Sequence, residues 1–371
     1  MNKIIYSGFY GFQNSGDDVF LETTAWATKN LMNEMSPVYF GNNLPQLVNP
    51  YTEYSKANFK GHDRLIAAYE LRNAAYFISA GGSTFSRHKK NSYKEIAEYV
   101  KKYYNKKLKT GAIGVSIGPF KTKEDEYNVQ EYLKRMNFLA VRDRRSFEYV
   151  NALNLPYKPV EAFDLAALLP EVYKDIPFNK EHNFENKKII GISICPVESI
   201  TNKNFIEKEE QRNRKIQELI KKLNSLHDNL IFRFFIINGH KNIGDENLTK
   251  KMIENLGIHN YEIVPYQNKV YDIWASIKNC DFMIATRLHA AIMAAYADVP
   301  FILNEYHQKC TDFVKDIGQN EAFIVGDADY NFNNLISSIS GILLEESKYN
   351  LTNKEETQQL SLKNFSFINQ Y

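Results

Sequence analysis

Residues 282–303 read FMIATRLHAAIMAAYADVPFIL, and this stretch decides the fold class. Its first four residues, 282–285, are apolar and predict a short buried strand. The small-residue run 290–297 predicts a helix, and residues 301–303 predict a second strand. A strand, a helix and a strand in this order are typical of a parallel sheet whose strands are joined by helical crossovers.

The same alternation extends along the chain in both directions, with one interruption. A first series of strands and helices fills the N-terminal half, and a second begins near residue 189. Between them, residues 170–188 are polar and lack periodicity, which indicates an interdomain linker. We therefore expect an α/β protein with two Rossmann-like domains, at residues 1–172 and 187–345. Residues 346–371 form a C-terminal tail that we expect to pack back on the first domain.

Composition and charge exclude several classes of protein. The chain has 371 residues, with 46 lysines and arginines against 44 acidic residues and a net charge of +2. Nucleic-acid binders usually carry a strong basic excess, so we expect no nucleic-acid partner. Cys195, Cys280 and Cys310 are widely spaced, which argues against disulfides or a zinc site and indicates a reducing cytoplasm. No apolar segment is long enough to span a membrane, so a lipid-linked substrate would be met by peripheral contact at the inner membrane face.

Glycine-rich and polar clusters follow several predicted strands. In open parallel sheets ligands bind beyond the carboxyl ends of the strands, so these clusters are candidate sites. The loop at residues 8–18, GFYGFQNSGDD, suits a phosphate or a sugar hydroxyl, because glycines allow close approach and a helix with free N–H groups follows. Asp17 and Asp18 equally favour a simple turn and helix cap. The glycine spacing does not match a dinucleotide-binding fingerprint.

Residues 286–291, TRLHAA, form the sharpest cluster. Thr286 is expected to cap the following helix, which would put Arg287 and His289 in its first turn. A helix N-terminus is already electropositive, so adding Arg and His there favours an anion-binding site. The competing interpretation is a surface arginine and a structural histidine. His240, after another predicted strand, and Lys309, beside His307, are weaker candidates, and no histidine has metal-ligand spacing.

Six motifs lie at residues 8–18, 80–83, 114–119, 141–146, 163–166 and, with an Arg-Leu-His signature, 285–290. Together and in this order they resemble the motifs of the polysaccharide pyruvyl transferases. The resemblance extends from about residue 4 to residue 318. It implies a GT-B-like architecture, in which two Rossmann-like domains face each other across a cleft. It also implies transfer of the enolpyruvyl unit of phosphoenolpyruvate to a sugar, usually with formation of a cyclic ketal and release of phosphate.

The resemblance implies roles for particular residues. Arg287 and His289 are expected at the phosphoenolpyruvate site, where Arg287 would hold the donor anion. A histidine titrates near neutral pH, so His289 suits the proton donor to the enol. Leu288, His240 and Lys309 are the further expected donor contacts, in the second domain. The expected acceptor contacts, in the first domain, are Asn14, Gly16, Asp17, Gly81, Gly82 and Ser83. We expect no metal and no cofactor, since phosphoenolpyruvate is the donor substrate and a glycan or lipid-linked saccharide the acceptor.

Two positions depart from the family pattern. Cys195 follows the first strand of the second domain, where many members carry an arginine, and residues 164–166, Asp-Leu-Ala, lack the usual proline. Two alternatives therefore remain beside pyruvyl transfer. One is a glycosyltransferase of the same fold that uses a nucleotide sugar, and the other is an inactive carbohydrate-binding relative.

Overall fold

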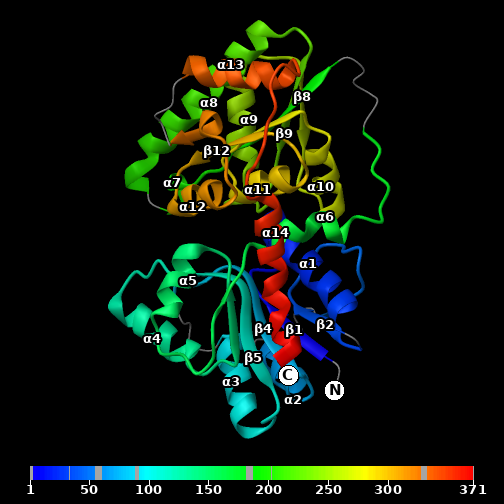
Figure 1. Ribbon diagram of the computed structural model, residues 1–371, viewed down its shortest axis with the longest axis vertical. Coiled ribbons are helices and arrows are strands. Elements are labelled where there is room, and N and C mark those ends of the chain that lie inside the picture. Colours follow the sequence, from blue (N-terminus) through cyan, green and yellow to red (C-terminus); the bar gives the residue numbers. More distant parts are fainter. Residues whose placement is uncertain are drawn as a thin grey trace. The chain divides into compact units, whose positions relative to one another are not determined.

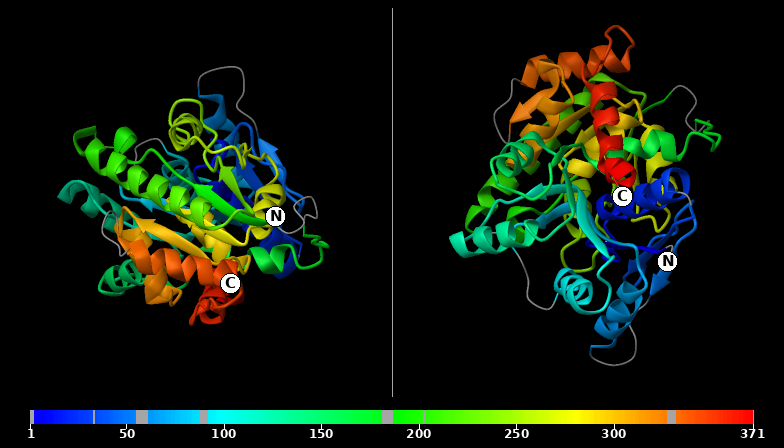
Figure 2. Two further views of the ribbon diagram at one scale, coloured as in Figure 1. Left: turned by 90° about the horizontal axis from the view of Figure 1, so that it is seen from above. Right: turned by 60° about the horizontal axis from the view of Figure 1, so that its bottom comes forward.

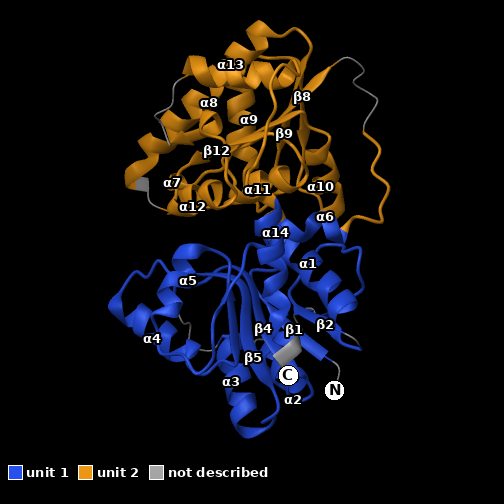
Figure 3. Cartoon of the chain, in the orientation of Figure 1, with its two compact units in different colours: residues 1–12, 17–172, 355–371 blue, residues 13–16, 173–354 orange. Residues whose placement is uncertain are grey.

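The chain divides into two compact units (Figure 3). The computed structural model describes residues 3–32, 34–54, 61–87, 92–180, 187–201, 203–326 and 332–370. The first unit comprises residues 1–12, 17–172 and 355–371, and the second comprises residues 13–16 and 173–354. The expected linker therefore falls mostly in the second unit, and its residues 181–186 lie outside the described part. Of the expected tail, residues 355–371 belong to the first unit.

In the described part of the first unit, seven parallel strands form one sheet in the order β3-β2-β1-β4-β5-β6-β7. The strands are β1 (Lys3–Ser7), β2 (Ser36–Phe40), β3 (Thr52–Tyr54), β4 (Tyr76–Phe85), β5 (Lys109–Ile117), β6 (Phe138–Val141) and β7 (Val160–Glu161). The α-helices are α1 (Ser15–Leu31), α2 (His62–Arg72), α3 (Tyr93–Tyr103), α4 (Lys123–Leu133), α5 (Arg144–Asn151), α6 (Leu169–Val172) and α14 (Lys354–Leu362).

Helices cover both faces of this sheet, because its strands are apolar on both sides (Figure 1). Alternate residues of one strand serve opposite faces: Ile4 packs with α1, whereas Ile5 packs with α2 and α3. The C-terminal 3₁₀ segment η4 (Lys363–Gln370) shares the face of α1. There the ring of Phe367 stacks on Phe138 with centroids 4.2 Å apart. The last residues of the chain thus complete the core of the first unit.

The second unit repeats the same topology. Its described strands are all parallel in the order β10-β9-β8-β11-β12-β13. They are β8 (Lys188–Ser193), β9 (Leu230–Phe235), β10 (Tyr261–Val264), β11 (Phe282–Ala285), β12 (Phe301–Glu305) and β13 (Ile324–Gly326). The α-helices are α7 (Glu198–Thr201), α8 (Ile206–Leu226), α9 (Glu246–Leu256), α10 (Val270–Lys278), α11 (Leu288–Tyr296), α12 (Gln308–Asp316) and α13 (Phe332–Leu343). The expected α/β class with two parallel-sheet, Rossmann-like units is confirmed.

Two local expectations are wrong. The sequence predicts a strand at residues 76–79 that ends in a glycine loop, but β4 continues through Gly81 and Gly82 to Phe85. Both glycines have positive φ, 74° and 75°, and a shift in strand register after Gly82 absorbs them. Thr286 does not cap α11 either. Arg287 occupies the N-cap position with extended backbone and no side-chain cap, so only His289 lies in the first turn.

Candidate functional site

Each sheet reverses its strand order at one point, and several predicted site residues lie there. The reversal occurs between β1 and β4 in the first unit and between β8 and β11 in the second. Such a switch point leaves a crevice at the carboxyl ends of the two strands, because their connections run to opposite faces. In the second unit Cys195 follows β8, and Arg287 and His289 follow β11. The candidate site therefore lies at this edge of the second sheet.

A buried carboxylate fixes the Arg287 side chain. Arg287 Nε donates to Asp245 Oδ1 at 3.0 Å and to Oδ2 at 3.2 Å, and Nη2 also donates to Oδ1. Asp245 is fully buried and also accepts from the backbone N–H of Asn238 at 2.9 Å. Burial raises the pKa of Asp245, while Arg287 opposes that shift. Asp245 thus binds Nε and Nη2 of Arg287 and leaves Nη1 without a bond to this carboxylate. The Arg287 side chain remains 22% exposed.

The loop at residues 13–16 carries Gly16 against His289. Ser15 donates its backbone N–H to Ile237 O at 2.9 Å, and Gly239 donates to Gln13 O at 2.8 Å. These bonds place the start of α1 beside the end of β9. A Cβ on Gly16 would lie 2.7 Å from Cγ of His289, with Nδ1 closer still. The position therefore accepts only glycine beside the imidazole, and Gly16 and His289 form one local site.

Buried side-chain oxygens lie at the ends of β8, β11 and β12. Ser193 Oγ, Thr286 Oγ1 and Asn304 Oδ1 have no hydrogen-bond partner among the described residues, and all three residues are at most 1% exposed. The register pairs Ser193 with Ala285 and Ala285 with Leu303, so the three follow one another across the sheet edge. Buried polar groups are nearly always satisfied in folded proteins, by the protein or by water or a ligand. This edge is therefore suited to a polar ligand.

Cations gather around the position where Cys195 replaces an expected arginine. Burial raises the pKa of the Cys195 thiol to about 11, and the opposing influences come from Arg287, Arg212 and Lys309. Arg212, on α8, is fully buried and forms two hydrogen bonds with the carboxylate of Glu198, at 2.7 and 3.2 Å. Cys195 is thus a neutral group in a basic environment.

The other expected donor contacts, Leu288, His240 and Lys309, follow strands of the second sheet and differ in their burial and contacts. Leu288 is buried as the first residue of α11. His240 lies in the loop that leads to Asp245, where its Nδ1 accepts from Asn242 N at 3.2 Å. Lys309 lies in the first turn of α12 with Nζ 5.7 Å from the ring centre of Tyr306. His307 Nδ1 accepts from the Lys309 backbone N–H and so caps α12.

The expected acceptor contacts are divided between the units. Asn14 pairs with Asn238 and, like Gly16, belongs to the second unit. Asp17 lies in the first unit, where a Cβ on Gly82 would be 3.8 Å from its Oδ1. Gly81 has the ring of Phe20 directly against its α-carbon, so its glycine is required by packing. The remaining residue, Ser83, is exposed at the end of β4.

The first unit contains its own buried ion pair. Arg142 follows β6 and donates from Nη1 to Asp164 Oδ2 at 2.6 Å and from Nε to Ser116 Oγ at 2.8 Å. Asp164 also caps the 3₁₀ segment η1 (Leu165–Leu168). The pair joins two of the motifs quoted from the sequence, residues 141–146 and 163–166, which are far apart in the chain.

Comparison with protein families decides the identity of the chain. The sequence model of the polysaccharide pyruvyl transferases matches residues 14–308, which include the loop at residue 14, the three buried ion pairs described above and the segment from Arg287 to His289. This chain belongs to the polysaccharide pyruvyl transferase family. A search of curated proteins finds no match.

Solved structures similar to this pyruvyl transferase family member share its GT-B-like fold. One is the UDP-GlcNAc 2-epimerase from Methanocaldococcus jannaschii, at 14% identity and a TM-score of 0.63, covering 98% of this chain and 99% of that one. Another is the UDP-GlcNAc 2-epimerase from Neisseria meningitidis bound to UDP-GlcNAc, at 13% identity, a TM-score of 0.60 and full coverage of both chains. A lipopolysaccharide outer core galactosyltransferase matches at 10% identity and a TM-score of 0.52, covering 99% and 98%. At these identities the likeness establishes the fold alone.

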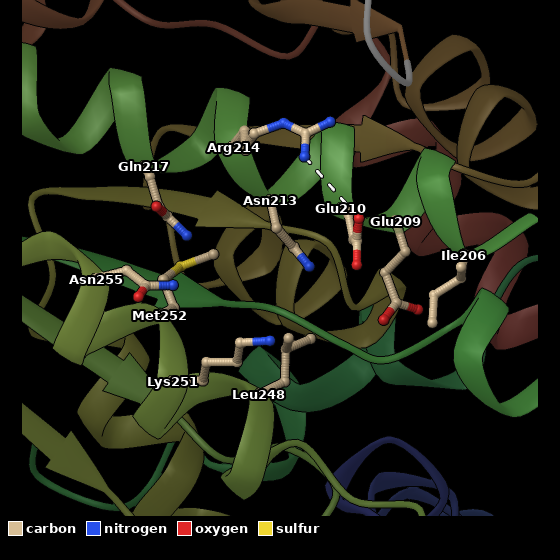
Figure 4. A pocket seen from close by; sticks show the side chains of 10 residues that line it. All are labelled: Ile206, Glu209, Glu210, Asn213, Arg214, Gln217, Leu248, Lys251, Met252 and Asn255. Atoms are coloured by element: carbon tan, nitrogen blue, oxygen red, sulfur yellow. Dashed lines mark ion pairs between the residues drawn. The ribbon is translucent and has the colours of Figure 1, made fainter.

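One pocket of this family member lies apart from the strand ends. It has a volume of about 380 Å³ and lies between α8 and α9, with Asn213, Arg214 and Lys251 among its lining residues (Figure 4). No residue predicted for the site lines it. Within the described ranges, no group of three or more His, Cys, Asp or Glu side chains could hold a metal ion. In the same part of the chain, no helix combines the length and apolar character needed to cross a bilayer.

Some residues of the candidate site carry no local signal in the sequence. Asp245 lies five residues after His240 in the sequence, but its pairing with Arg287 joins positions 42 residues apart and leaves no local pattern. Ser193 and Asn304 lie at the ends of apolar strands and carry no motif, whereas Thr286 lies in the TRLHAA cluster and is predicted there only as a helix cap. The signal that could have found them is positional, since each is the polar residue that ends or follows a buried strand.

Proposed function

We propose that this protein transfers the enolpyruvyl unit of phosphoenolpyruvate to a sugar of a polysaccharide or of its lipid-linked precursor, forming a ketal and releasing phosphate. Family membership supports pyruvyl transfer to a polysaccharide in general. The observation that carries the finer proposal is the Arg287–Asp245 pair beside His289 at the end of β11. The three buried free cysteines fit a reducing compartment, so we propose that the reaction takes place in the cytoplasm.

The charges near Arg287 suit the donor. Phosphoenolpyruvate carries a carboxylate and a phosphate, which arginine, lysine and helix N-termini bind best. The α11 N-terminus lies at Arg287, and Asp245 orients the guanidinium so that its other edge can meet an anion. Lys309 adds a second cation. We propose that these groups bind the donor, with the Ser193 and Thr286 hydroxyls as polar contacts.

We propose that His289 donates a proton to C3 of the enol. Protonation makes C2 electrophilic, so that one sugar hydroxyl attacks C2 and a second displaces phosphate from the same carbon. The two hydroxyl protons are released, one replacing the proton taken from His289 and the other leaving with phosphate. General acid catalysis of this kind contributes about two to four orders of magnitude in rate.

The test is phosphate release from phosphoenolpyruvate with a panel of acceptor glycans. We expect release only when donor and a suitable acceptor are both present, and mass spectrometry should find the pyruvyl ketal on the glycan. Phosphoenolpyruvate should also raise the unfolding temperature, because a ligand that binds only the native state stabilises it. Absence of both effects across the panel would refute the proposal.

One alternative function has support of its own. The similar solved structures include a UDP-GlcNAc 2-epimerase bound to UDP-GlcNAc and a lipopolysaccharide outer core galactosyltransferase. Glu305, at the end of β12, uses Oε2 to accept from Thr311, while its buried Oε1 has no hydrogen-bond partner in the described part. A carboxylate there suits a ribose hydroxyl of a nucleotide sugar. UDP, rather than phosphoenolpyruvate, would then raise the unfolding temperature, and neither would do so in an inactive carbohydrate-binding relative.

A further inference from the structure

Three exposed tyrosines form a cluster on the first unit, far in the sequence from the candidate site. Tyr99, Tyr103 and Tyr104 are 54%, 57% and 56% exposed, at the end of α3 and just after it. The ring centre of Tyr99 lies 4.9 Å from that of Tyr103 and 5.8 Å from that of Tyr104. Contiguous exposed aromatic surface of this kind indicates an interaction site more often than scattered single residues do. We call these three residues the tyrosine patch.

Basic residues surround the tyrosine patch. Lys102 Nζ lies 5.0 Å from the ring centre of Tyr103, and the Arg72 guanidinium lies 5.2 Å from that of Tyr104. Residues 101–109 contain the five lysines Lys101, Lys102, Lys106, Lys107 and Lys109 and no acid. Among the acids nearby, Glu98 is paired with Arg135 at 2.7 Å. Glu95 and Glu98 line the same surface as Lys101, Lys102, Lys106 and Arg135, so cations outnumber acids beside the aromatic rings.

The neighbouring helix α2 extends this surface. Leu65 and Tyr69 are each 64% exposed, and the spacing of four and then three residues to Arg72 puts all three on one helical face. Figures 1 and 2 show α2 and α3 side by side, and their Ala67, Leu71, Ala97 and Val100 share one core cluster. The buried faces of these helices supply the core, and Leu65, Tyr69 and the tyrosine patch lie on their exposed side.

We propose that the tyrosine patch and its lysines form a docking surface for an anionic phospholipid bilayer. Tyrosine is favoured at the level of lipid headgroups, where the ring meets apolar matter and the hydroxyl meets water. Lysine and arginine bind anionic lipid phosphates from the water side, and their long stems reach past apolar surface. The surface has both elements over two adjacent helices.

The ring packing favours a bilayer over a glycan. A sugar ring stacks on an open aromatic face, but Tyr99 is packed by two neighbouring rings, and cations lie by Tyr103 and Tyr104. These neighbours occupy part of each ring and leave less open aromatic face for a sugar to stack on. The surface extends the proposed function by bringing the enzyme to a membrane, where lipid-linked acceptors lie. Its test needs no turnover, so the two proposals can fail separately.

The experiment is co-sedimentation of the full chain with vesicles of phosphatidylcholine alone or mixed with phosphatidylglycerol. We expect binding only to the anionic vesicles, weakened by added salt. Each juxtamembrane lysine strengthens binding about fivefold, so Lys102→Gln with Lys106→Gln should weaken it about 25-fold. Replacing Tyr99, Tyr103 and Tyr104 by serine should weaken it at least about tenfold through lost apolar burial.

Control variants carry the same types of substitution, Lys→Gln and Tyr→Ser, at exposed positions outside the patch. Lys221→Gln with Lys222→Gln alters two exposed lysines of α8, and Tyr127→Ser removes a tyrosine that is 61% exposed on α4. Both should bind like wild type. The Gln variant tests the proposal if the serine variant does not fold, as judged by thermal unfolding. No vesicle binding, equal binding to neutral vesicles, unchanged binding by both patch variants, or selective binding of a soluble acidic glycan by the patch would overturn the proposal.

Discussion

Replacing Gly16 by alanine should disable the proposed proton donor, His289, by displacing its side chain rather than by substituting it. The new Cβ would lie 2.7 Å from His289 Cγ and 3.0 Å from its Cβ, with Nδ1 nearer still. Carbon atoms pack at about 3.5 to 4.0 Å, so the imidazole must move by about 1 Å. A misplacement of that size can cost about a hundredfold in rate, and overpacking typically costs about 1 to 3 kcal/mol of stability.

Two assays separate these effects. Phosphate release from phosphoenolpyruvate should fall about a hundredfold in Gly16→Ala, while urea denaturation reports the stability loss. The His289→Ala variant has no imidazole ring, so adding Gly16→Ala to it should leave the free energy of unfolding almost unchanged. The effects of the two substitutions on that free energy should therefore be strongly non-additive. Wild-type turnover in a folded Gly16→Ala protein would refute the assignment of His289. An unchanged stability cost in the double variant would refute the contact.

Four further changes test other parts of the structure. His289→Ala should reduce turnover by about two to four orders of magnitude while calorimetry still detects phosphoenolpyruvate binding, whereas near-normal turnover of His289→Asn would assign the histidine a structural role. Asp245→Asn should lower the free energy of unfolding by about 3 kcal/mol, measured in urea, because the Arg287 charge loses its buried partner; an unchanged value would contradict the pair. Burial lowers the pKa of Lys94 to about 7 from 10.5, so the unfolded chain binds more protons between these pH values and stability should rise with pH there. Lys94→Met should remove that part of the rise, and an identical pH profile would count against it. Phe367→Ala should cost about 3 to 5 kcal/mol in the first unit by emptying a core position, and a wild-type melting curve would show that the tail contributes no packing energy.

Much of the fold could be predicted from the sequence because strand and helix patterns are local. The segment from 282 to 303 predicts a strand, a helix and a strand from hydrophobicity alone, and the structure has β11, α11 and β12 there. Errors occurred where a local signal had two interpretations. Gly81 and Gly82 are typical of a loop, yet neighbouring strands hold them in β4 with positive φ.

The candidate site depended on contacts between distant parts of the chain. The sequence indicated Arg287 and His289, because two basic side chains at a helix start are unusual. It carried no sign that Asp245 would orient Arg287 or that Gly16 would lie against the imidazole. Hydrophobic periodicity specifies which face of an element is buried, whereas the strand order decides which loops meet at the sheet edge. Residues 16 and 289 are neighbours because Gln13 and Ser15 form backbone hydrogen bonds with Gly239 and Ile237, just after β9. Only the tertiary structure decides this pairing.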